Sequence, residues 1–379
     1  MAKTVFDQMK EQGSERIMAD FKRKQKEDYA FKRNYAEGRA WEFLEHKDIA
    51  GSAYVAVGGL DSIVLFLFLR SIGIDVPAVS VSSLEDKSIQ RVHKALGVQA
   101  LPPAQKADGT RWTKHEIIRE FGYPVISKEI AGKIHLLQNP TPENATVRHA
   151  IITGETGAYG GFQKSSRMKL SQKWLQKFGG ADAEGAALGY AAADFPVSDK
   201  CCYYLKEKPC NDYAKVSGRY PYMGLMASEG GRRQKALMLH GCNYISPGTK
   251  RSCPFAIFNR DDLLRLAMEM DAWYQEHWSK FPGERLETIV PSIYGQIVKQ
   301  ENGLLETTGA TRTGCEICMF GITKEKRPHR FDRLRAENPK AWEFWMHEMG
   351  FGHVLDYVGV AWRDRVPITE QLRMEVSPP

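Results

Sequence analysis

The sequence lacks any long hydrophobic run. No apolar stretch among its 379 residues approaches the roughly 18 residues that a membrane-spanning helix needs. Residues 1–48 are charged throughout and lack the apolar core of a signal peptide. Hydrophobic residues make up 42% and charged residues 26% of the chain, as in an ordinary soluble protein. We therefore expect a cytoplasmic protein without a membrane partner.

The cysteines do not suit a set of structural disulfides. There are seven, an odd number that includes two close pairs. Because structural disulfides are rare in reducing compartments, these pairs indicate metal binding or redox chemistry instead. The net charge of +7 favours an anionic partner, such as a nucleotide or a nucleic acid, although many basic enzymes contact no nucleic acid.

Apolar runs of strand length alternate with segments of helix length. Residues 53–57 form an apolar run that ends at two glycines, which is typical of a buried strand. Further strands are predicted over 74–81 and 124–127, and helices over 63–69, 85–96, 115–121 and 261–278. The alternation predicts an α/β fold, in which a parallel sheet carries helices on both faces.

Three segments are expected along the chain. Residues 1–48 are predicted to form a polar helical arm exposed to solvent. Residues 49–300 hold the α/β domain. Residues 301–379 hold a C-x-x-C segment and a largely helical C-terminal region packed on that domain.

The strongest local motif is the glycine loop Val57-Gly58-Gly59-Leu60-Asp61-Ser62, where a predicted strand turns into a helix. Two glycines allow the backbone to approach a ligand closely, and the helix N-terminus offers N–H groups and a positive dipole to an anion. Ser62 can add a hydroxyl donor. Asp61 is acidic, so we expect it to orient the loop or to bind Mg²⁺. No Gly-Lys-Ser/Thr sequence follows, which excludes a Walker loop; a simple tight turn remains the alternative.

Two cysteine pairs could bind a metal. Cys201 and Cys202 are adjacent, and Cys315 and Cys318 form a C-x-x-C sequence that places two thiolates on one side of a turn. A redox dithiol, half of a zinc site and half of a cluster site all fit this spacing. The other three cysteines are expected to be small buried side chains. Of these, Cys210 could replace a ligand and Cys242 could carry sulfur; Cys253 has no such alternative.

The glycine loop resembles the Ser-Gly-Gly-X-Asp-Ser pyrophosphate loop (PP-loop) of the adenine nucleotide alpha-hydrolase superfamily. That superfamily includes the N-type ATP pyrophosphatases and the phosphoadenosine phosphosulfate (PAPS) reductases. The resemblance implies a Rossmann-like α/β domain that binds ATP or an adenosine phosphosulfate. Val57 replaces the first serine of the pattern. The loss of one hydrogen bond to a charged group would cost about 1.5–3 kcal/mol.

The resemblance continues beyond the loop. The combination of Cys201 and Cys202 with Cys315 and Cys318 is similar to the [4Fe–4S] signature of assimilatory adenosine phosphosulfate reductases, which implies these four as cluster ligands. The segment 224–233 is similar to the part of PAPS reductase-like proteins that meets a sulfate or phosphate. The segments 315–321, 324–328 and 354–360 resemble family members that are common in phages and mobile elements. Because guanidinium groups suit such anions, the expected contacts around the nucleotide are Glu229, Arg232, Arg233, Lys250 and Arg251.

One feature of the sulfonucleotide reductases is missing. They carry a C-terminal cysteine whose thiolate attacks sulfur, but no cysteine follows Cys318 here. We therefore expect ATP-dependent adenylation and sulfur transfer, with nucleic acid as one candidate acceptor, a sulfur or electron donor protein as partner, and Asp61, Ser62 and Arg233 in catalysis. The alternatives are a reductase that releases sulfite, a nucleotide- or nucleic-acid-binding module with a structural cluster, and a zinc protein with an inactive loop.

Overall fold

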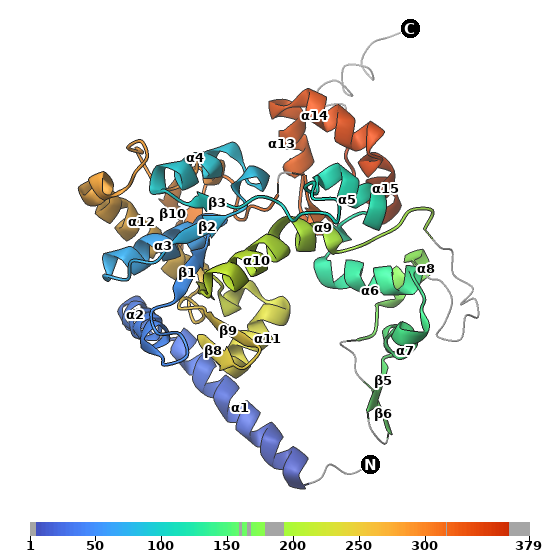
Figure 1. Cartoon of the computed structure of the whole chain (residues 1–379), viewed down its shortest axis with the longest axis horizontal. Coiled ribbons are helices and arrows are strands. Elements are labelled where there is room, and N and C mark those ends of the chain that lie inside the picture. The colour runs from blue at the N-terminus through green and yellow to red at the C-terminus, as the bar shows by residue number, and fades with distance from the viewer. Residues whose placement is uncertain (1–4, 159–160, 165–167, 179–192, 316, 364–379) are drawn as a thin grey trace. The chain divides into compact units, whose positions relative to one another are not determined.

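The computed structural model describes residues 5–158, 161–164, 168–178, 193–315 and 317–363 (Figure 1). The chain divides into two compact units. The first unit comprises Met1–Arg111 and Leu205–Cys315, and the second comprises Trp112–Tyr204 and Glu316–Pro379. The predicted boundaries at residues 48 and 300 both fall inside the first unit.

A six-stranded sheet organises the first unit, with the strand order β3-β2-β1-β7-β9-β8. All neighbouring strands are parallel except β8 and β9, which are antiparallel at one edge. The strands are β1 (Ala53–Ala56), β2 (Ala78–Ser80), β3 (Gln99–Ala100), β7 (Tyr220–Tyr222), β8 (Asn243–Ser246) and β9 (Thr249–Ser252). The expected mixed α/β fold with a mostly parallel central sheet is confirmed.

The strand order reverses between β1 and β7. From β1 the chain adds β2 and then β3 on one side, and it later returns to place β7 and β9 on the other side. In open parallel sheets, ligands bind at such a switch point, outside the carboxyl ends of the strands. The fold therefore singles out the loops that follow β1 and β7 as the place to look for a site.

Helices cover both faces of the sheet. Val55 pairs with Tyr222, so the two share one face, and the Tyr222 hydroxyl donates to the Ala40 carbonyl of α2 (Tyr29–Glu45) at 2.6 Å. Tyr54 points to the opposite face, because successive side chains of a strand alternate. Its ring lies against that of Tyr213 in α10 (Lys208–Ser217), with centroids 5.1 Å apart.

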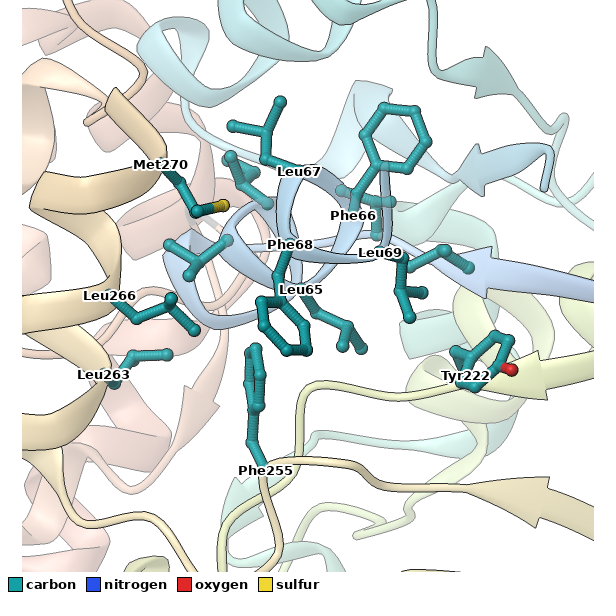
Figure 2. Packing of buried hydrophobic residues seen from close by; sticks show 14 of the residues in the cluster. Leu65, Phe66, Leu67, Phe68, Leu69, Tyr222, Phe255, Leu263, Leu266 and Met270 are labelled. Atoms are coloured by element: carbon teal, nitrogen blue, oxygen red, sulfur yellow. The ribbon is translucent and has the colours of Figure 1, made fainter. Parts of the chain in front are cut away.

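The helix α3 (Leu60–Ser71), which follows the glycine loop, is buried from Ile63 to Leu69. Figure 2 shows its leucine and phenylalanine side chains surrounded by Phe255, Tyr222 and the apolar side of α12 (Arg260–His277). Each such side chain removed from water contributes about 1.5–3 kcal/mol. This packing fixes the helix, and with it the N-terminal turn that faces the loop.

The α2 part of the predicted solvent-exposed arm packs against the core. In α2, Ala36, Ala40 and Phe43 are fully buried at helical spacing, so one face of the helix joins the core. Lys32 is also buried, and its ammonium group forms a 2.8 Å ion pair with Asp262 at the start of α12. The apolar stripe is narrow and the surrounding residues of 1–48 are polar, so the sequence analysis did not predict that this segment is buried. The remaining longer elements of the unit are α1 (Val5–Gln25), α4 (Lys87–Leu96), α11 (Gly231–His240), β10 (Ile297–Lys299) and β11 (Leu305–Thr307).

The second unit is mainly helical and has its own hydrophobic core, in which Phe178, Phe331 and Phe351 are fully buried. Two short strands, β4 (Val125–Ile126) and β12 (Met319–Phe320), pair in parallel, and β5 (Glu155–Ala158) pairs with β6 (Gly161–Lys164) in antiparallel fashion. The helices are α5 (Lys114–Phe121), α6 (Lys128–Gln138), α7 (Ala145–Thr153), α8 (Gln172–Phe178), α9 (Lys200–Cys202), α13 (Arg330–Glu337), α14 (Pro339–Glu343) and α15 (Phe351–Val358). Across the described ranges of both units, no helix combines the length and apolarity that a membrane crossing requires.

Candidate functional site

A pocket of about 400 Å³ opens at the carboxyl ends of β1, β2 and β7 in the first unit. Its walls come from segments far apart in the sequence, which the switch point of the sheet brings together. The lining residues are Ala56, Val57, Gly58, Gly59, Asp61, Ser62, Ser80, Val81, Glu85, Lys206, Cys210, Met223, Gly224, Leu225, Glu229, Arg233, Tyr294, Thr311, Arg312 and Thr313. The predicted glycine loop is therefore one wall of a real hollow, together with Glu229 and Arg233.

The glycine loop is braced from within by Ser62. The Gly58 amide donates to the Ser62 hydroxyl oxygen at 2.7 Å, and the hydroxyl donates to the Gly59 carbonyl at 2.9 Å. Gly59 is the N-cap residue of α3 and makes no side-chain cap hydrogen bond. The Ser62 hydroxyl was expected to donate to a ligand. The structure uses its single proton inside the loop, so the residue shapes the loop in this state.

Close backbone packing explains a glycine that lies outside the loop. A Cβ atom on Gly224, just after β7, would lie 2.8 Å from the backbone carbon and oxygen of Asp61 and 2.9 Å from the Ser62 nitrogen. Only a residue without Cβ allows the β7 loop to approach the first turn of α3 so closely. The pocket floor thus depends on contact between two backbones.

Asp61 ties the loop to two other elements. Its Oδ1 atom accepts from the Arg260 guanidinium at 2.9 Å, at the start of α12, and from the Leu305 amide at 2.8 Å, at the start of β11. Burial raises the pKa of Asp61, while the positive charge of Arg260 opposes that shift. These contacts match an orienting role for Asp61. Its other predicted role, at Mg²⁺, stays a prediction.

Two arginines meet on one buried carboxylate. The Glu229 side chain is only 8% exposed, and it pairs with Arg233 at 3.2 Å and with Arg312 at 3.1 Å. Both arginine side chains are largely exposed, at 62% and 60%. Arg233 was predicted, but Arg312 was not. The only sequence signal for Arg312 is its place in a Thr-Arg-Thr-Gly stretch directly before Cys315.

Two predicted anion contacts, Lys250 and Arg251, lie outside the pocket. Tyr222 of β7 pairs with Ser252 of β9, so Lys250 and Arg251 precede that level on a strand parallel to β1. The Lys250 ammonium group donates to the Asp48 carbonyl at 3.3 Å, before β1 begins, and Arg251 lies over the Tyr244 ring. Neither residue lines the pocket. The side chain of the third, Arg232, lies outside the described part of the chain.

His93 also holds the loop, although no sequence pattern pointed to this residue. Its Nε2 atom lies 2.8 Å from the Gly58 carbonyl oxygen, and since a carbonyl only accepts, Nε2 carries the proton. The ring is 1% exposed, and burial lowers its pKa. Nearby, Lys206 donates to Glu85 at 2.6 Å on the pocket wall. Lys206 was not among the predicted site residues.

Val57 occupies the position where the similar loops carry serine. Its amide donates to the Val79 carbonyl at 2.9 Å, which continues the β1–β2 pairing into the loop. Its side chain is 6% exposed and belongs to the hydrophobic core of the first unit. The backbone of the loop is thus held by the sheet, and the side chain adds packing in place of a hydroxyl.

The seven cysteines, all within the described part of the chain, form no disulfide. Cys201, Cys202 and Cys318 belong to the second unit, and Cys315 is the last residue of the first. Among the described residues, no three or more His, Cys, Asp or Glu side chains are grouped to hold a metal ion. Because the four predicted ligands are divided between the two units, the predicted [4Fe–4S] group stays a prediction.

The other three cysteines have different surroundings. Cys242 and Cys253 are buried in the core, and burial raises the pKa of each thiol to about 12, which confirms the expected small buried side chains. Cys210, in contrast, lines the pocket. Burial raises the pKa of Cys210 as well, while the positive charge of Lys206 opposes that shift.

A second hollow of about 330 Å³ adjoins the first. Both hollows are lined by Asp61, Glu229, Thr311 and Arg312, and the second is also lined by Arg260 and Glu306.

The chain was compared with known proteins by sequence and by structure. No family model, curated protein or solved structure matches it.

Proposed function

We propose that the chain is a PP-loop enzyme, similar to the PAPS reductases, with a Rossmann-like nucleotide-binding domain. It binds ATP on the β1–α3 loop and cleaves it between the α- and β-phosphates. One observation carries the proposal: the glycine loop opens at the switch point of a parallel sheet into a 400 Å³ pocket that also holds exposed arginine side chains. Helix N-termini and glycine-rich turns bind phosphate at such places.

In the proposed reaction, an acceptor oxygen attacks the α-phosphorus atom. The bond from that phosphorus to the bridging oxygen breaks, pyrophosphate leaves, and the acceptor carries AMP. The hollow beyond Asp61 offers room for the acceptor beside the nucleotide pocket. Arg233 and Arg312 stabilise the charge that develops on the leaving pyrophosphate, because charged donors aimed at developing charge lower the barrier. Asp61 and His93 hold the loop in shape.

Sulfur transfer to the adenylated acceptor extends this proposal. A donor protein would supply the sulfur, and nucleic acid is one candidate acceptor. An iron–sulfur cluster, if bound by Cys201, Cys202, Cys315 and Cys318, would supply sulfur or electron chemistry. The adenylation step described above requires only residues of the first unit.

The test is pyrophosphate release from ATP by anaerobically purified protein, with and without nucleic acid. We expect release by the wild type and a loss of about 10- to 100-fold in Arg233→Ala, since a hydrogen bond to a charged group contributes about 1.5–3 kcal/mol. Asp61→Asn should also lose activity. Lys235→Ala, an exposed change on the same helix as Arg233, is the control and should retain full activity. Absence of pyrophosphate release under all conditions would refute adenylation.

A second candidate is a reductase that releases sulfite, and the position of Cys210 favours it. A Cys210 thiolate in the pocket could attack the sulfur of an adenosine phosphosulfate, and the adenosine phosphate would leave with the electrons of the broken S–O bond. A second thiol, from a donor protein, would then attack the Cys210 sulfur, release sulfite and leave a disulfide. Sulfite production that is lost in Cys210→Ser would establish this reading. Nucleotide binding without either turnover would indicate a binding module.

A further inference from the structure

We propose that the second unit binds the phosphate backbone of a nucleic acid along a basic cleft beside α13. A hollow of about 880 Å³ lies there, compared with about 400 Å³ for the glycine-loop pocket. Its lining residues all come from two segments of the second unit, 322–336 and 359–361, and we call this hollow the α13 cleft. The inference concerns binding by the second unit and does not depend on ATP cleavage by the first.

Positive charge is concentrated in the longer of the two lining segments. Residues 324–335 contain six basic and two acidic side chains, so this short stretch carries a charge of +4, out of +7 for the whole chain. Such a density of one sign attracts a polyanion and speeds its association. The basic residues are Lys324, Lys326, Arg327, Arg330, Arg333 and Arg335.

Both carboxylates of this stretch already have arginine partners. Glu325 accepts from the Arg330 guanidinium at 2.9 Å, and Asp332 accepts from the Arg327 guanidinium at 3.2 Å. These pairs leave the remaining basic side chains uncompensated by the acidic residues of the segment. The charge excess is therefore a property of the folded cleft and not only of the sequence.

Three of the basic side chains are available to a ligand. Lys324, Lys326 and Arg333 are exposed, and no carboxylate in the described ranges forms an ion pair with any of them. Lys326 lines the α13 cleft itself. It lies in the loop before α13, whereas Arg333 lies within the helix. Positive charge is thus offered by both the loop and the helix.

Contacts between the two lining segments hold the α13 cleft in shape. The His329 ring is 2% exposed, and its Nε2 atom lies 2.9 Å from the Ala361 carbonyl oxygen. Because a carbonyl only accepts, Nε2 carries the proton. The Arg327 guanidinium donates to the Arg363 carbonyl, just beyond the shorter segment. The loop that carries Lys326 is therefore fixed before a ligand arrives, which reduces the entropy lost on binding.

This arrangement suits a chain of phosphates better than a single small anion. A site for one anion gathers several donors around one point, whereas Lys324, Lys326 and Arg333 are spread over the loop and the helix. A nucleic acid carries a negative charge at each nucleotide, so it can contact several separate cations at once. Contacts to the backbone carry no sequence information. We therefore expect binding that depends strongly on salt and little on sequence.

The test is fluorescence anisotropy of the full-length chain with a labelled oligonucleotide, without ATP and over a series of salt concentrations. The oligonucleotide is used as single-stranded DNA, duplex DNA and single-stranded RNA. The wild type should bind at least one of them. Lys326→Ala combined with Arg333→Ala should weaken that binding at least about tenfold. The slope of log K against log salt should fall in magnitude by about 1.4–1.8, since each lost phosphate contact removes about 0.7–0.9.

Two control proteins isolate the role of charge in the α13 cleft. Lys280→Ala removes one exposed positive charge from the first unit and should change neither affinity nor slope. Lys326→Arg combined with Arg333→Lys keeps both charges and should keep the salt slope. The substituted side chains are exposed, so all variants should fold, and circular dichroism checks this.

Absence of binding to all three nucleic acids would overturn the proposal, as would binding that the double alanine variant leaves unchanged. Binding to vesicles of anionic lipid but to no oligonucleotide would also overturn it and would indicate a membrane surface as the partner. None of these outcomes depends on pyrophosphate release. Failure of the proposed function and failure of the nucleic-acid site are therefore separate results.

Discussion

The backbone amide of Leu60 donates a 3.0 Å hydrogen bond to the hydroxyl group of Tyr294. This bond joins the first residue of α3 to a segment 234 residues later in the chain. The same hydroxyl lies 2.6 Å from the hydroxyl of Thr313, in the loop that carries Arg312. Tyr294 therefore links the end of the glycine loop to the loop that supplies the unexpected arginine.

The Tyr294→Phe variant should lower the stability of the first unit. Tyr294 is only 3% exposed, so removal of its hydroxyl leaves the Leu60 amide without its partner in a buried setting. An unsatisfied buried polar group costs about 1–3 kcal/mol, and we expect the free energy of unfolding to fall by that amount. Urea denaturation measures it. Tyr220→Phe, whose hydroxyl has only a long 3.4 Å contact with Lys250, should change little. Equal losses of stability in Tyr294→Phe and Tyr220→Phe would contradict a stabilising role for the Tyr294 hydroxyl group.

Breaking the ion pair between Lys32 and Asp262 should destabilise the protein strongly. Both side chains are nearly inaccessible, at 4% and 6% exposure, and Asp262 also accepts from the Asn259 amide at 2.8 Å. Lys32→Met would leave a buried charge without its partner, which costs about 3–5 kcal/mol. Thermal and urea unfolding would measure this loss of stability. The exposed pair of Arg91 and Glu284 is the control, and Arg91→Gln should cause no measurable change. A small effect of Lys32→Met would mean that α2 is not docked as described.

A methyl group at Gly224 should distort the glycine loop. The added Cβ would overlap the backbone of Asp61 and Ser62, and backbone atoms can retreat only by moving the first turn of α3. We expect Gly224→Ala to weaken ATP binding at least about tenfold, as the loss of one hydrogen bond to a charged group would. Circular dichroism would check that the fold persists. Gly248→Ala is a matched control, since nothing lies within 4 Å of the position a Cβ would take there. Unchanged ATP binding in Gly224→Ala would separate the loop from the nucleotide site.

The buried ring of His93 should make stability depend on pH in weakly acidic solution. Burial lowers the pKa of His93, so the native protein keeps the ring neutral, whereas the unfolded chain takes up a proton near pH 6.5. Stability is therefore constant with respect to this group above pH 6.5. It falls as the pH drops toward the lower native pKa, by at most about 1.4 kcal/mol per pH unit.

Comparison with His93→Gln isolates this contribution. Glutamine can still donate to the Gly58 carbonyl, but it does not titrate. Urea unfolding of both proteins between pH 7.5 and 5 should show the wild type losing more stability than the variant as the pH falls. Parallel losses would mean that His93 is protonated in the native state as well.

Features that depend on local sequence pattern were predicted correctly. The apolar run before Gly58 and Gly59, and the alternation of strands with helices, predicted a parallel α/β sheet with the glycine loop at the end of a strand. Glu229 and Arg233 were also anticipated, and they line the same pocket. These features follow from the periodicity of side chains and from the conformational freedom of glycine, both of which are properties of short segments.

The distant residues that complete the site became apparent from the folded chain. The pairing of β7 with β1 brings Gly224 to the loop, and the packing of the later segments brings Arg260, Tyr294 and Arg312 to the same end of the sheet. The same strand order leaves Lys250 outside the pocket, despite its suitable charge. The physical reason is that strand order and direction are set by long-range burial of apolar surface, which no short segment encodes. The sequence therefore shows that a side chain is basic, but it does not show where in the folded protein that side chain lies.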